Sequence, residues 1–324
     1  MTIGKIVVIG GPTASGKSGL ALAVAEAFGG TVINADSMQV YRDLRILTAR
    51  PAPEDEARVP HRLYGVLDGA ELCSAARWRA MALAEIEAAA AAGQLPVVVG
   101  GTGLYLRALT EGLAEIPPVP DEVRAAARAL HAEIGGAAFR ERLAALDPAG
   151  AARLPPGDTQ RLIRAYEVAL ATGQPLGAWR DAARRGAQER RLDAEIATIV
   201  LQPPRGPLYE ACDARFAAMV EQGGGALEEV RVLVARGLDP SLPVMKAVGV
   251  RELAACLAGT LPLAEAVARA QRETRRYAKR QTTWFRHQAP AGAKMIDEQF
   301  SERLRPILFS FIRQFLLTRT TSGN

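Results

Sequence analysis

Eight residues near the start of the chain have the spacing of a phosphate-binding loop. The run GPTASGKS matches G-x-x-x-x-G-K-[ST] and follows an apolar segment at residues 5–9. Glycines let backbone N–H groups surround an anion, and a helix that begins at the lysine adds positive partial charge. An ordinary glycine turn, the alternative interpretation, would lack this helix. We therefore expect a diphosphate or triphosphate to be held by Gly11, Pro12, Thr13, Ala14, Ser15, Gly16, Lys17 and Ser18.

Within this loop, two side chains have predicted tasks. Lys17 places an ammonium on the phosphates, and the Ser18 hydroxyl is a ligand for Mg²⁺. In an ATPase or kinase, an acidic residue normally ends a later strand and helps hold this metal. The candidate strand at residues 95–99 runs into Gly100 without a carboxylate. An ordinary nucleotide hydrolase or kinase is therefore less favoured.

The acid expected nearest to the loop is Asp36, at the end of a second apolar strand at residues 31–35. The carboxyl ends of parallel strands form the crevice in which such sheets bind ligands. Asp36 there can accept a proton from a nucleophile or hold Mg²⁺ through water. Because Asp is also a good helix cap, a purely structural role in starting the next helix stays open.

The first hundred residues alternate between strand and helix patterns. Strands are predicted at residues 5–9, 31–35 and 95–99, and helices at residues 17–28 and 74–92, before a Gly-Gly-Thr-Gly turn. Short apolar strands between helices predict an α/β fold whose core is a parallel sheet of the P-loop kind with helices on both faces. Residues 195–201 resume the strand pattern.

The rest of the chain has mostly helical periodicity. Residues 113–189 are rich in Ala, Arg and Glu and are predicted to be an inserted helical domain. Residues 1–112 and 190–290 then form the core with its helical C-terminal region, and residues 291–324 form a tail without an assigned role, in which residues 307–317 are apolar enough for a helix. An apolar stripe of the last core helix is predicted from Leu263, Val267, Ala270, Thr274, Tyr277, Gln281 and Trp284.

Composition limits the classes of protein that fit. With 324 residues and 49% hydrophobic residues, the chain is long enough for a packed core. Its three cysteines lack C-x-x-C spacing, which argues against a zinc site or a disulfide framework. We find neither a signal-peptide pattern nor a transmembrane stretch, and expect a cytoplasmic protein without membrane contact.

Positive charge is concentrated near the C-terminal end of the core. The net charge is +5, and between Arg269 and Arg286 Lys and Arg residues far outnumber the single Glu273. Such a local excess is typical of a surface that binds a phosphate backbone. The alternative is a solvated helix face.

Seven blocks of the sequence together resemble the tRNA dimethylallyltransferases, also called tRNA isopentenyltransferases. They occur in the family's order and span residues 5 to about 287. The blocks are GPTASGKS (11–18), DSMQVY (36–41), PHR (60–62), VGGTGLY (99–105), QRLIR (160–164), VG (248–249) and KRQTTW (279–284).

The resemblance implies transfer of dimethylallyl from dimethylallyl diphosphate to the exocyclic amine of the adenosine 3′-adjacent to the anticodon, assisted by Mg²⁺. An ATP-binding or nucleotide-binding assignment would follow from the loop pattern rather than from this chemistry. Asp36 matches the proposed general base, and Thr102 lies beside the reacting amine. Ser37, Met38 and Gln39 line the flipped adenine.

The resemblance also implies contacts with the anticodon stem-loop of tRNA, by a protein expected to be a monomer. The matching residues are Arg124, Gln160, Arg161, Leu162, Ile163, Arg164, Lys246, Ala247, Val248, Gly249, Val250, Arg251, Thr274, Arg275, Arg276, Tyr277, Ala278, Lys279, Arg280 and Gln281.

One position departs from the family pattern. Many relatives carry an Arg where Ala211 stands, and either Arg205 or Arg215 is expected to replace it unless the enzyme manages without one. Three other functions are weighed against tRNA prenylation. An adenylate isopentenyltransferase has little use for the basic C-terminal helix, a small-molecule kinase transfers phosphate from ATP, and a non-catalytic tRNA-binding protein has no need of the loop.

Overall fold

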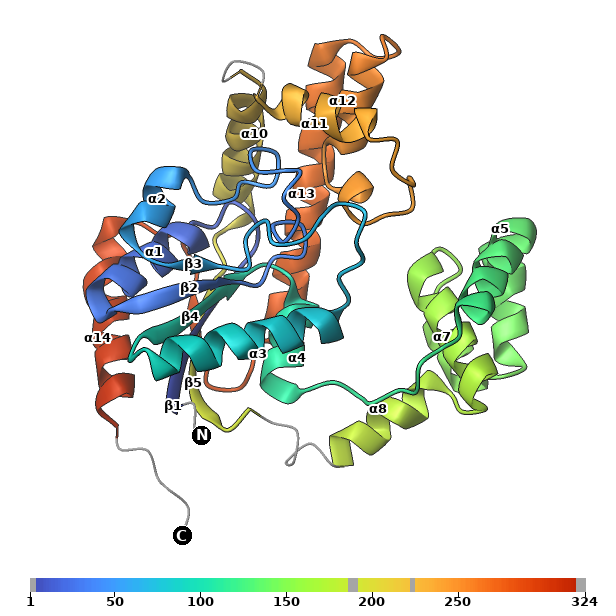
Figure 1. Cartoon of the computed structure of the whole chain (residues 1–324), viewed down its shortest axis with the longest axis horizontal. Coiled ribbons are helices and arrows are strands. Elements are labelled where there is room, and N and C mark those ends of the chain that lie inside the picture. Colours follow the sequence, from blue (N-terminus) through green and yellow to red (C-terminus); the bar gives the residue numbers. More distant parts are fainter. Residues whose placement is uncertain (1–3, 186–191, 222–224, 319–324) are drawn as a thin grey trace. The chain divides into compact units, whose positions relative to one another are not determined.

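The computed structural model describes residues 4–185, 192–221 and 225–318, and it contains two compact units (Figure 1). We call them the sheet unit, formed by Met1–Thr110 with Asp193–Asn324, and the helical unit, formed by Glu111–Leu192. The expected insertion, residues 113–189, falls within the helical unit, although its last residues lie outside the described part of the chain. Each unit is described below by itself.

A six-stranded, fully parallel sheet forms the centre of the sheet unit, with the strand order β3-β2-β4-β1-β5-β6. The α/β fold expected from the alternating pattern is confirmed, with β1, β2, β4 and β5 close to their predicted positions. The strands are β1 (Gly4–Gly10), β2 (Gly30–Asn34), β3 (His61–Arg62), β4 (Leu95–Gly100), β5 (Ala194–Leu201) and β6 (Lys294–Ile296).

The described residues of the sheet unit also form helices. They are α1 (Lys17–Phe28), α2 (Pro53–Arg58), α3 (Ala75–Ala91), α4 (Gly103–Glu111, which runs to the border of the helical unit), α10 (Arg205–Glu221), α11 (Gly225–Ala235), α12 (Val250–Leu257), α13 (Leu263–Gln288) and α14 (Arg305–Leu317), with 3-10 turns η1 (Val244–Lys246) and η2 (Glu302–Leu304). Of these helices, α11 and α12 pack on other helices rather than on the sheet. In the part of the chain that the structure describes, no helix is both long and apolar enough to cross a membrane.

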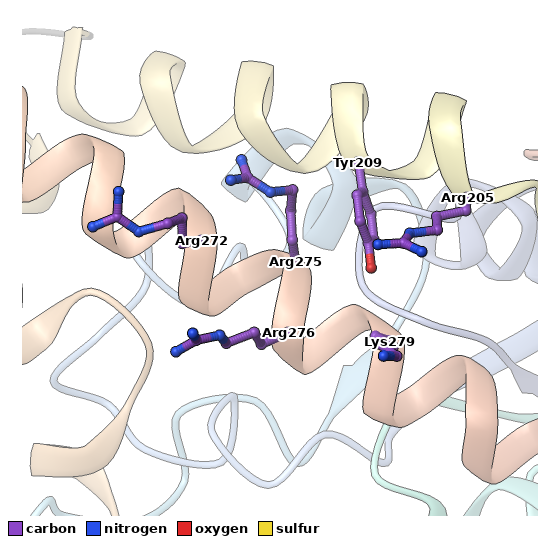
Figure 2. Close-up of a pocket in the computed structure, with 6 residues that line it drawn as sticks. All are labelled: Arg205, Tyr209, Arg272, Arg275, Arg276 and Lys279. Atoms are coloured by element: carbon purple, nitrogen blue, oxygen red, sulfur yellow. The ribbon is translucent and has the colours of Figure 1, made fainter.

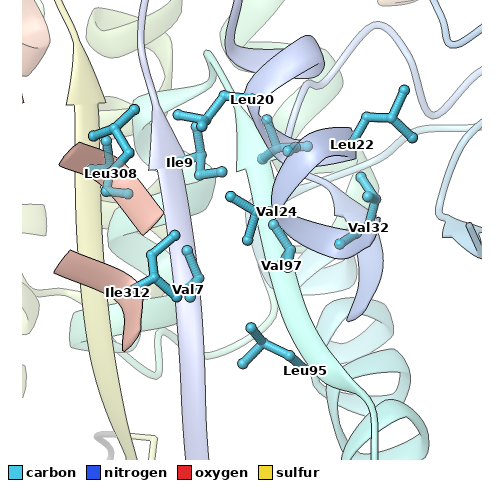
Figure 3. Close-up of a cluster of buried hydrophobic side chains, with 14 of the residues drawn as sticks. Val7, Ile9, Leu20, Leu22, Val24, Val32, Leu95, Val97, Leu308 and Ile312 are labelled. Atoms are coloured by element: carbon cyan, nitrogen blue, oxygen red, sulfur yellow. The ribbon is translucent and has the colours of Figure 1, made fainter. Parts of the chain in front are cut away.

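One face of the sheet is covered by α1 and α14, which lie far apart in the sequence (Figure 3). Val7 and Ile9 of β1 and Val97 of β4 point to this face, where they meet Leu20 and Leu308. All five side chains are fully buried. Burial of an aliphatic side chain stabilises a fold by about 1.5–3 kcal/mol, so α14 is an integral part of the core.

The tail, whose role the sequence left open, therefore has a structural task. The helix expected at residues 307–317 is confirmed as α14, and the unpredicted strand β6 adds an edge to the sheet beside β5. Lys5 of β1 donates hydrogen bonds to the carbonyl oxygens of Phe315, Leu316 and Thr318. These contacts fix the end of α14 against the first strand.

The helical unit has its own core. Its helices are α5 (Asp121–Ala144), α6 (Pro148–Arg153), α7 (Thr159–Thr172) and α8 (Leu176–Arg185), and its described residues contain no strand, as expected. Phe139 and Leu143 of α5 and Leu162 and Val168 of α7 are fully buried together. Gly135, at φ 74°, interrupts α5 with a kink.

The longest described helix, α13, buries a stripe that shares only Ala270, Thr274 and Gln281 with the predicted one. Leu263 is 44% exposed, whereas the buried residues are Ala266, Ala270, Thr274, Ala278, Gln281 and Phe285. Small alanines let α13 approach its neighbours closely, so they occupy the centre of the contact. The predicted members Tyr277 and Trp284 flank that stripe and are only partly buried.

Candidate functional site

The loop between β1 and α1 has a compact, turn-like backbone. Ala14 (φ 61°) and Gly16 (φ 84°) both adopt left-handed conformations, and the Ser15 N–H donates to the Pro12 carbonyl oxygen at 3.3 Å. Lys17 lies back across the loop, with its Nζ 3.4 Å from the same carbonyl oxygen. Ser18 is exposed on the first turn of α1. This is a conformation in which loop N–H groups and a helix N-terminus can face an anion.

Two helices from the second half of the chain hold this loop in place. Gln281 of α13 accepts a hydrogen bond from the Thr13 N–H at 2.8 Å and donates one to the Gly101 carbonyl oxygen at 2.9 Å. Arg215 of α10 donates to the Thr13 hydroxyl. Ala14 packs against a small cluster of Leu208, Cys212 and Ala278 from the same two helices. The seam between α10 and α13 therefore supports the loop.

The C-terminal tail supports the same loop through other contacts. The Phe300 N–H donates to the Ser15 carbonyl oxygen at 3.1 Å, and Gln299 Nε2 donates to the Ala14 carbonyl oxygen at 3.0 Å. A Cβ added at Gly16 would lie 2.9 Å from the Phe300 Cβ. Glycine is thus required there both by its positive φ and by the closeness of the tail.

Asp36 lies just beyond the carboxyl end of β2, the strand that pairs with β4. Its Oδ1 accepts the Met38 N–H at 2.9 Å, and its own N–H donates to Asn34 Oδ1 at 2.8 Å. Residues 37–40 form a turn rather than a helix, so the structural alternative left open for Asp36, a helix cap, is corrected to a turn cap. Asn34 is fully buried and also donates to the Asp36 and Leu63 carbonyl oxygens, which fixes the backbone beneath the carboxylate.

Thr102 connects the end of β4 to the Asp36 turn. Its hydroxyl accepts the Ser37 N–H at 2.9 Å and lies 3.3 Å from the Ser37 hydroxyl. Thr102 also interacts with the Tyr277 phenol of α13, which partly offsets the rise in the pKa of that phenol. Nearby, a Cβ at Gly103 would lie 2.2 Å from the indole of Trp284, so the glycine turn is where α13 reaches the sheet.

Charge interactions link the loop to Asp36. Burial lowers the pKa of Lys17 to about 8, an effect that the Asp36 carboxylate opposes and the Arg215 guanidinium reinforces. Burial also lowers the pKa of Arg215, again against the influence of Asp36. The pKa of Tyr277 is raised by burial and by the same carboxylate. Two cations, one carboxylate and a phenol therefore share one site in the sheet unit.

The turn after Asp36 is fixed by side-chain hydrogen bonds to a later part of the chain. Gln39 Nε2 donates to the carbonyl oxygens of Thr48 and Ala49, both at 2.8 Å, so this amide nitrogen already has two partners. Ser37 and Met38 are partly buried beside it.

The predicted contact segment at the middle of α13 has an exposed and a buried side. Lys279 and Arg280 are exposed, and Arg280 lies 5.5 Å from the ring centroid of Tyr277. Arg275 forms an ion pair with Asp213, and Arg276 forms one with Glu273. The side chains of Thr274, Ala278 and Gln281 are buried and are not available to a partner in this structure.

The segment from Lys246 to Arg251 has the same division. Lys246 and Arg251 are exposed at its two ends, although Arg251 forms an ion pair with Glu252. Ala247, Gly249 and Val250 are buried, and Val248 is partly buried. The two charged ends are therefore the members of this segment that can meet a partner directly.

In the helical unit, the predicted contact residues also alternate between surface and core. Gln160 and Arg161 are exposed, and Arg161 pairs with Asp158. Arg124 and Arg164 are partly exposed and pair with Asp121 and Glu167, respectively. Leu162 is fully buried in the core of this unit, with Ile163 packed against it.

Comparison with known proteins decides the family. The model of the IPP transferase family matches residues 39–288, which is most of the chain. This chain belongs to the IPP transferase family. The tRNA dimethylallyltransferase of Rhodospirillum centenum is 62% identical over 298 residues, covering 92% of this chain and 93% of the relative. That of Paramagnetospirillum magneticum is 57% identical, covering 96% and 97% of the two chains.

Solved structures agree with this assignment. The tRNA isopentenylpyrophosphate transferase of Bacillus halodurans is 32% identical, with a TM-score of 0.66 and coverage of 96% of both chains. A eukaryotic dimethylallyltransferase acting on tRNA has a TM-score of 0.78 at 26% identity, covering 99% of this chain and 81% of its own. The resemblance inferred from the seven sequence blocks is thus confirmed.

The departure at Ala211 has a structural resolution in this IPP transferase. Arg215 reaches the loop at Thr13, whereas Arg205 lies 5.0 Å from the ring centroid of Tyr209 at the start of α10. Of the two arginines considered from the sequence, Arg215 is therefore the one beside the phosphate-binding loop. The sequence could not show which of the two arginines faces the loop, because both lie on one helix whose packing is set by distant parts of the chain.

Among the described residues, no group of three or more His, Cys, Asp or Glu side chains gathers into a cluster that could hold a metal ion by itself. Oxygen donors at or near the loop include the exposed Ser18 hydroxyl and the Asp36 carboxylate, which acts electrostatically on Lys17. Hard oxygen donors of this kind fit Mg²⁺, which commonly takes one or two protein ligands and completes its shell with phosphate oxygens and water.

Proposed function

We propose that this chain transfers a dimethylallyl group from dimethylallyl diphosphate to the exocyclic amine of the adenosine 3′-adjacent to the anticodon in tRNA, releasing diphosphate. The observation that carries this proposal is that the phosphate-binding loop after β1 and Asp36 after β2 lie at the same carboxyl edge of the parallel sheet, on either side of β4, where the Asp36 carboxylate acts electrostatically on Lys17. Membership of the IPP transferase family and the names of the relatives support it.

The loop serves the leaving group. When the C–O bond between the allylic carbon and the diphosphate breaks, the electron pair stays on the diphosphate oxygen. Lys17, the loop N–H groups and Arg215 offer positive charge at that position, and preorganised charge of this kind is commonly the largest contribution to catalysis. Because Arg215 also donates to Thr13, it is held at the edge of the loop.

The Asp36 turn serves the acceptor. The amine nitrogen forms the new bond to the allylic carbon, and the proton that it loses passes to the Asp36 carboxylate. Oδ1 is engaged by the Met38 N–H, which leaves Oδ2 for this proton. Thr102 and Ser37 hold the turn and line the position of the base. An adenine stacked in the anticodon loop cannot reach this position, so the base has to swing out.

Mg²⁺ belongs to this proposal as a ligand of the diphosphate. Ser18, and Asp36 through water, would hold it, and it would supply positive charge that offsets the charge on the leaving group. Orientation of the amine and removal of its proton are carried by Asp36, Ser37 and Thr102.

The anticodon stem-loop is the proposed macromolecular partner. Its phosphates would meet the exposed cations of α13, of the Lys246–Arg251 segment and of the helical unit. A monomer suffices for this proposal, because the loop, Asp36 and Thr102 all come from one chain.

The acceptor is tested by incubating labelled dimethylallyl diphosphate with either unmodified tRNA or AMP. We expect label in the tRNA and none in AMP. The exposed cations of α13 lie outside the loop, where they can contact the phosphates of a bound RNA but not a single nucleotide held at the loop. Label that enters AMP alone would instead identify an adenylate isopentenyltransferase. Phosphate transfer from ATP would identify a kinase.

A further inference from the structure

A basic groove runs between α10 and α13, which pack against each other. Figure 2 shows its six lining residues, with Arg205 and Tyr209 on α10 and the other four on α13. The volume of the groove is about 250 Å³, and its lining consists of Arg205, Tyr209, Arg272, Arg275, Arg276 and Lys279. Only the last three of these were expected to contact RNA from the sequence.

The groove has an excess of positive charge. Five of its six lining side chains are cations, and none is acidic. Asp213 partly neutralises Arg275, with both carboxylate oxygens 2.6 Å from Nη1, and Glu273 pairs with Arg276. In the described part of the chain, the remaining cations, Arg205, Arg272 and Lys279, have no acidic partner. An anion in the groove would therefore meet uncompensated charge.

Two contacts hold cations of the groove in place before any ligand binds. The Arg205 guanidinium lies 5.0 Å from the Tyr209 ring centroid, a cation–π arrangement that orients a long side chain without neutralising it. Asp213 similarly fixes Arg275 at the opposite wall. Ordering side chains in advance lowers the entropic cost of binding.

The length of the groove suits a polymer better than a single anion. Arg272 and Lys279 are seven residues apart, a rise of roughly 10 Å along an α-helix. Cations spaced over such a length can meet successive phosphates of one strand. The same two helices hold Ala14 of the phosphate-binding loop through Leu208 and Ala278, so a strand bound here is anchored on the elements that support the active site.

We infer that this groove binds the phosphate backbone of RNA, with Arg205 and Arg272 as phosphate contacts and Tyr209 as the residue that positions Arg205. This inference rests on the proposed function, because tRNA supplies the RNA. It adds three residues of α10 and α13 to the surface expected from the sequence. Arg272 shares the face of Arg275, Arg276 and Lys279 at helical spacing, whereas Arg205 joins them only in the folded chain.

The test measures the affinity of the full chain for unmodified tRNA over a range of salt concentrations. Arg205→Gln and Arg272→Gln should each weaken binding and reduce the slope of log affinity against log salt by roughly 0.7 to 0.9, the effect of losing one phosphate contact. Tyr209→Leu should weaken binding by freeing Arg205, whereas Tyr209→Phe keeps the ring and should bind like the wild type.

Arg269→Gln is the matched control, because Arg269 lies on α13 outside the groove and pairs with Glu265. It should change neither the slope nor the affinity. The inference is overturned if both groove variants, with wild-type melting temperatures, keep the wild-type slope. It is also overturned if they lose affinity for inorganic diphosphate and not for tRNA. If the groove variants show the reduced slope but the wild-type chain binds tRNA and transfers no dimethylallyl group, the inference about the groove holds and the proposed function is rejected.

Discussion

At the scale of single residues, Asp36 has two tasks that a substitution can separate. Its Oδ1 caps the turn by accepting the Met38 N–H, and its charge acts on Lys17, Arg215 and Tyr277. An asparagine can cap the turn in the same way, because its side-chain oxygen accepts the same hydrogen bond. It cannot accept a proton.

Asp36→Asn should therefore keep the fold and tRNA binding while slowing the transfer step. We expect a reduction of roughly 100-fold to 10,000-fold, the usual range for losing a positioned base. The measurement is a single-turnover experiment with both substrates saturating, so that slow product release does not hide the effect. A folded variant that retains more than about a tenth of the wild-type rate would show that Asp36 only orients the turn, since that loss falls below the same range.

Lys17 leads to a prediction about pH. Its pKa is lowered to about 8, so the side chain is charged below that pH and increasingly neutral above it in the absence of donor. Donor binding above pH 8 must then be accompanied by uptake of a proton. The affinity for dimethylallyl diphosphate, measured without tRNA, should be highest below pH 8 and fall by up to about tenfold per pH unit above it.

Lys17→Arg provides the control for this titration. A guanidinium stays protonated throughout the range, so the pH dependence above 8 should disappear even if the affinity itself is lower. A wild-type affinity that stays constant from pH 7 to 9.5 would contradict the assignment of Lys17 to the diphosphate.

At the scale of elements, the C-terminal tail supports the loop that we propose as the donor site. The chain between β6 and α14 carries Gln299 and Phe300, which bond to the carbonyl oxygens of Ala14 and Ser15. Because Ala14 is held in a left-handed conformation, these contacts help to fix the direction of the loop N–H groups.

Gln299→Ala should therefore raise the KM for the donor without changing tRNA affinity. Losing one hydrogen bond to the loop costs about 1 kcal/mol, which corresponds to roughly a fivefold change. Glu298→Ala is the matched control, since Glu298 precedes Gln299 in the tail and pairs with Arg303 rather than with the loop. Equal donor KM values for the two variants would show that the tail stabilises the fold and does not support donor binding.

Several elements could be predicted from sequence because their patterns are local. The helix at residues 17–28 was placed at both ends, since Gly16 and Gly29 adopt the left-handed conformations at its boundaries. Strands β3 and β6 were missed, because two and three residues are too few to show a periodic pattern. Their pairing with β2 and β5 depends on distant parts of the chain.

In the candidate site too, residues in local motifs could be predicted from sequence, and residues that depend on distant contacts could not. The loop spacing identifies Lys17 and Ser18, and the end of a strand identifies Asp36. Gln281 was assigned to RNA from the resemblance, but the structure places it between Thr13 and Gly101 as a support of the loop. Gln299 escaped notice because its contact with Ala14 joins residues that are 285 positions apart.

At the scale of the whole molecule, the sheet unit carries both the loop and the acid, and cations are exposed on both units. The two ends of the described chain also meet, since Lys5 holds the end of α14. The proposed transfer to tRNA requires a phosphate-binding loop for the donor and exposed cations for the polyanionic acceptor. Both features are present in the sheet unit.

The most direct test of this account uses the wild-type chain with unmodified tRNA, dimethylallyl diphosphate and Mg²⁺, in the absence of ATP. The nucleosides of the digested tRNA are then identified by mass spectrometry. We predict a dimethylallyl group on the exocyclic amine of the adenosine 3′-adjacent to the anticodon, with one diphosphate released for each group transferred. Unmodified tRNA under these conditions, or modification that requires ATP, would contradict the account.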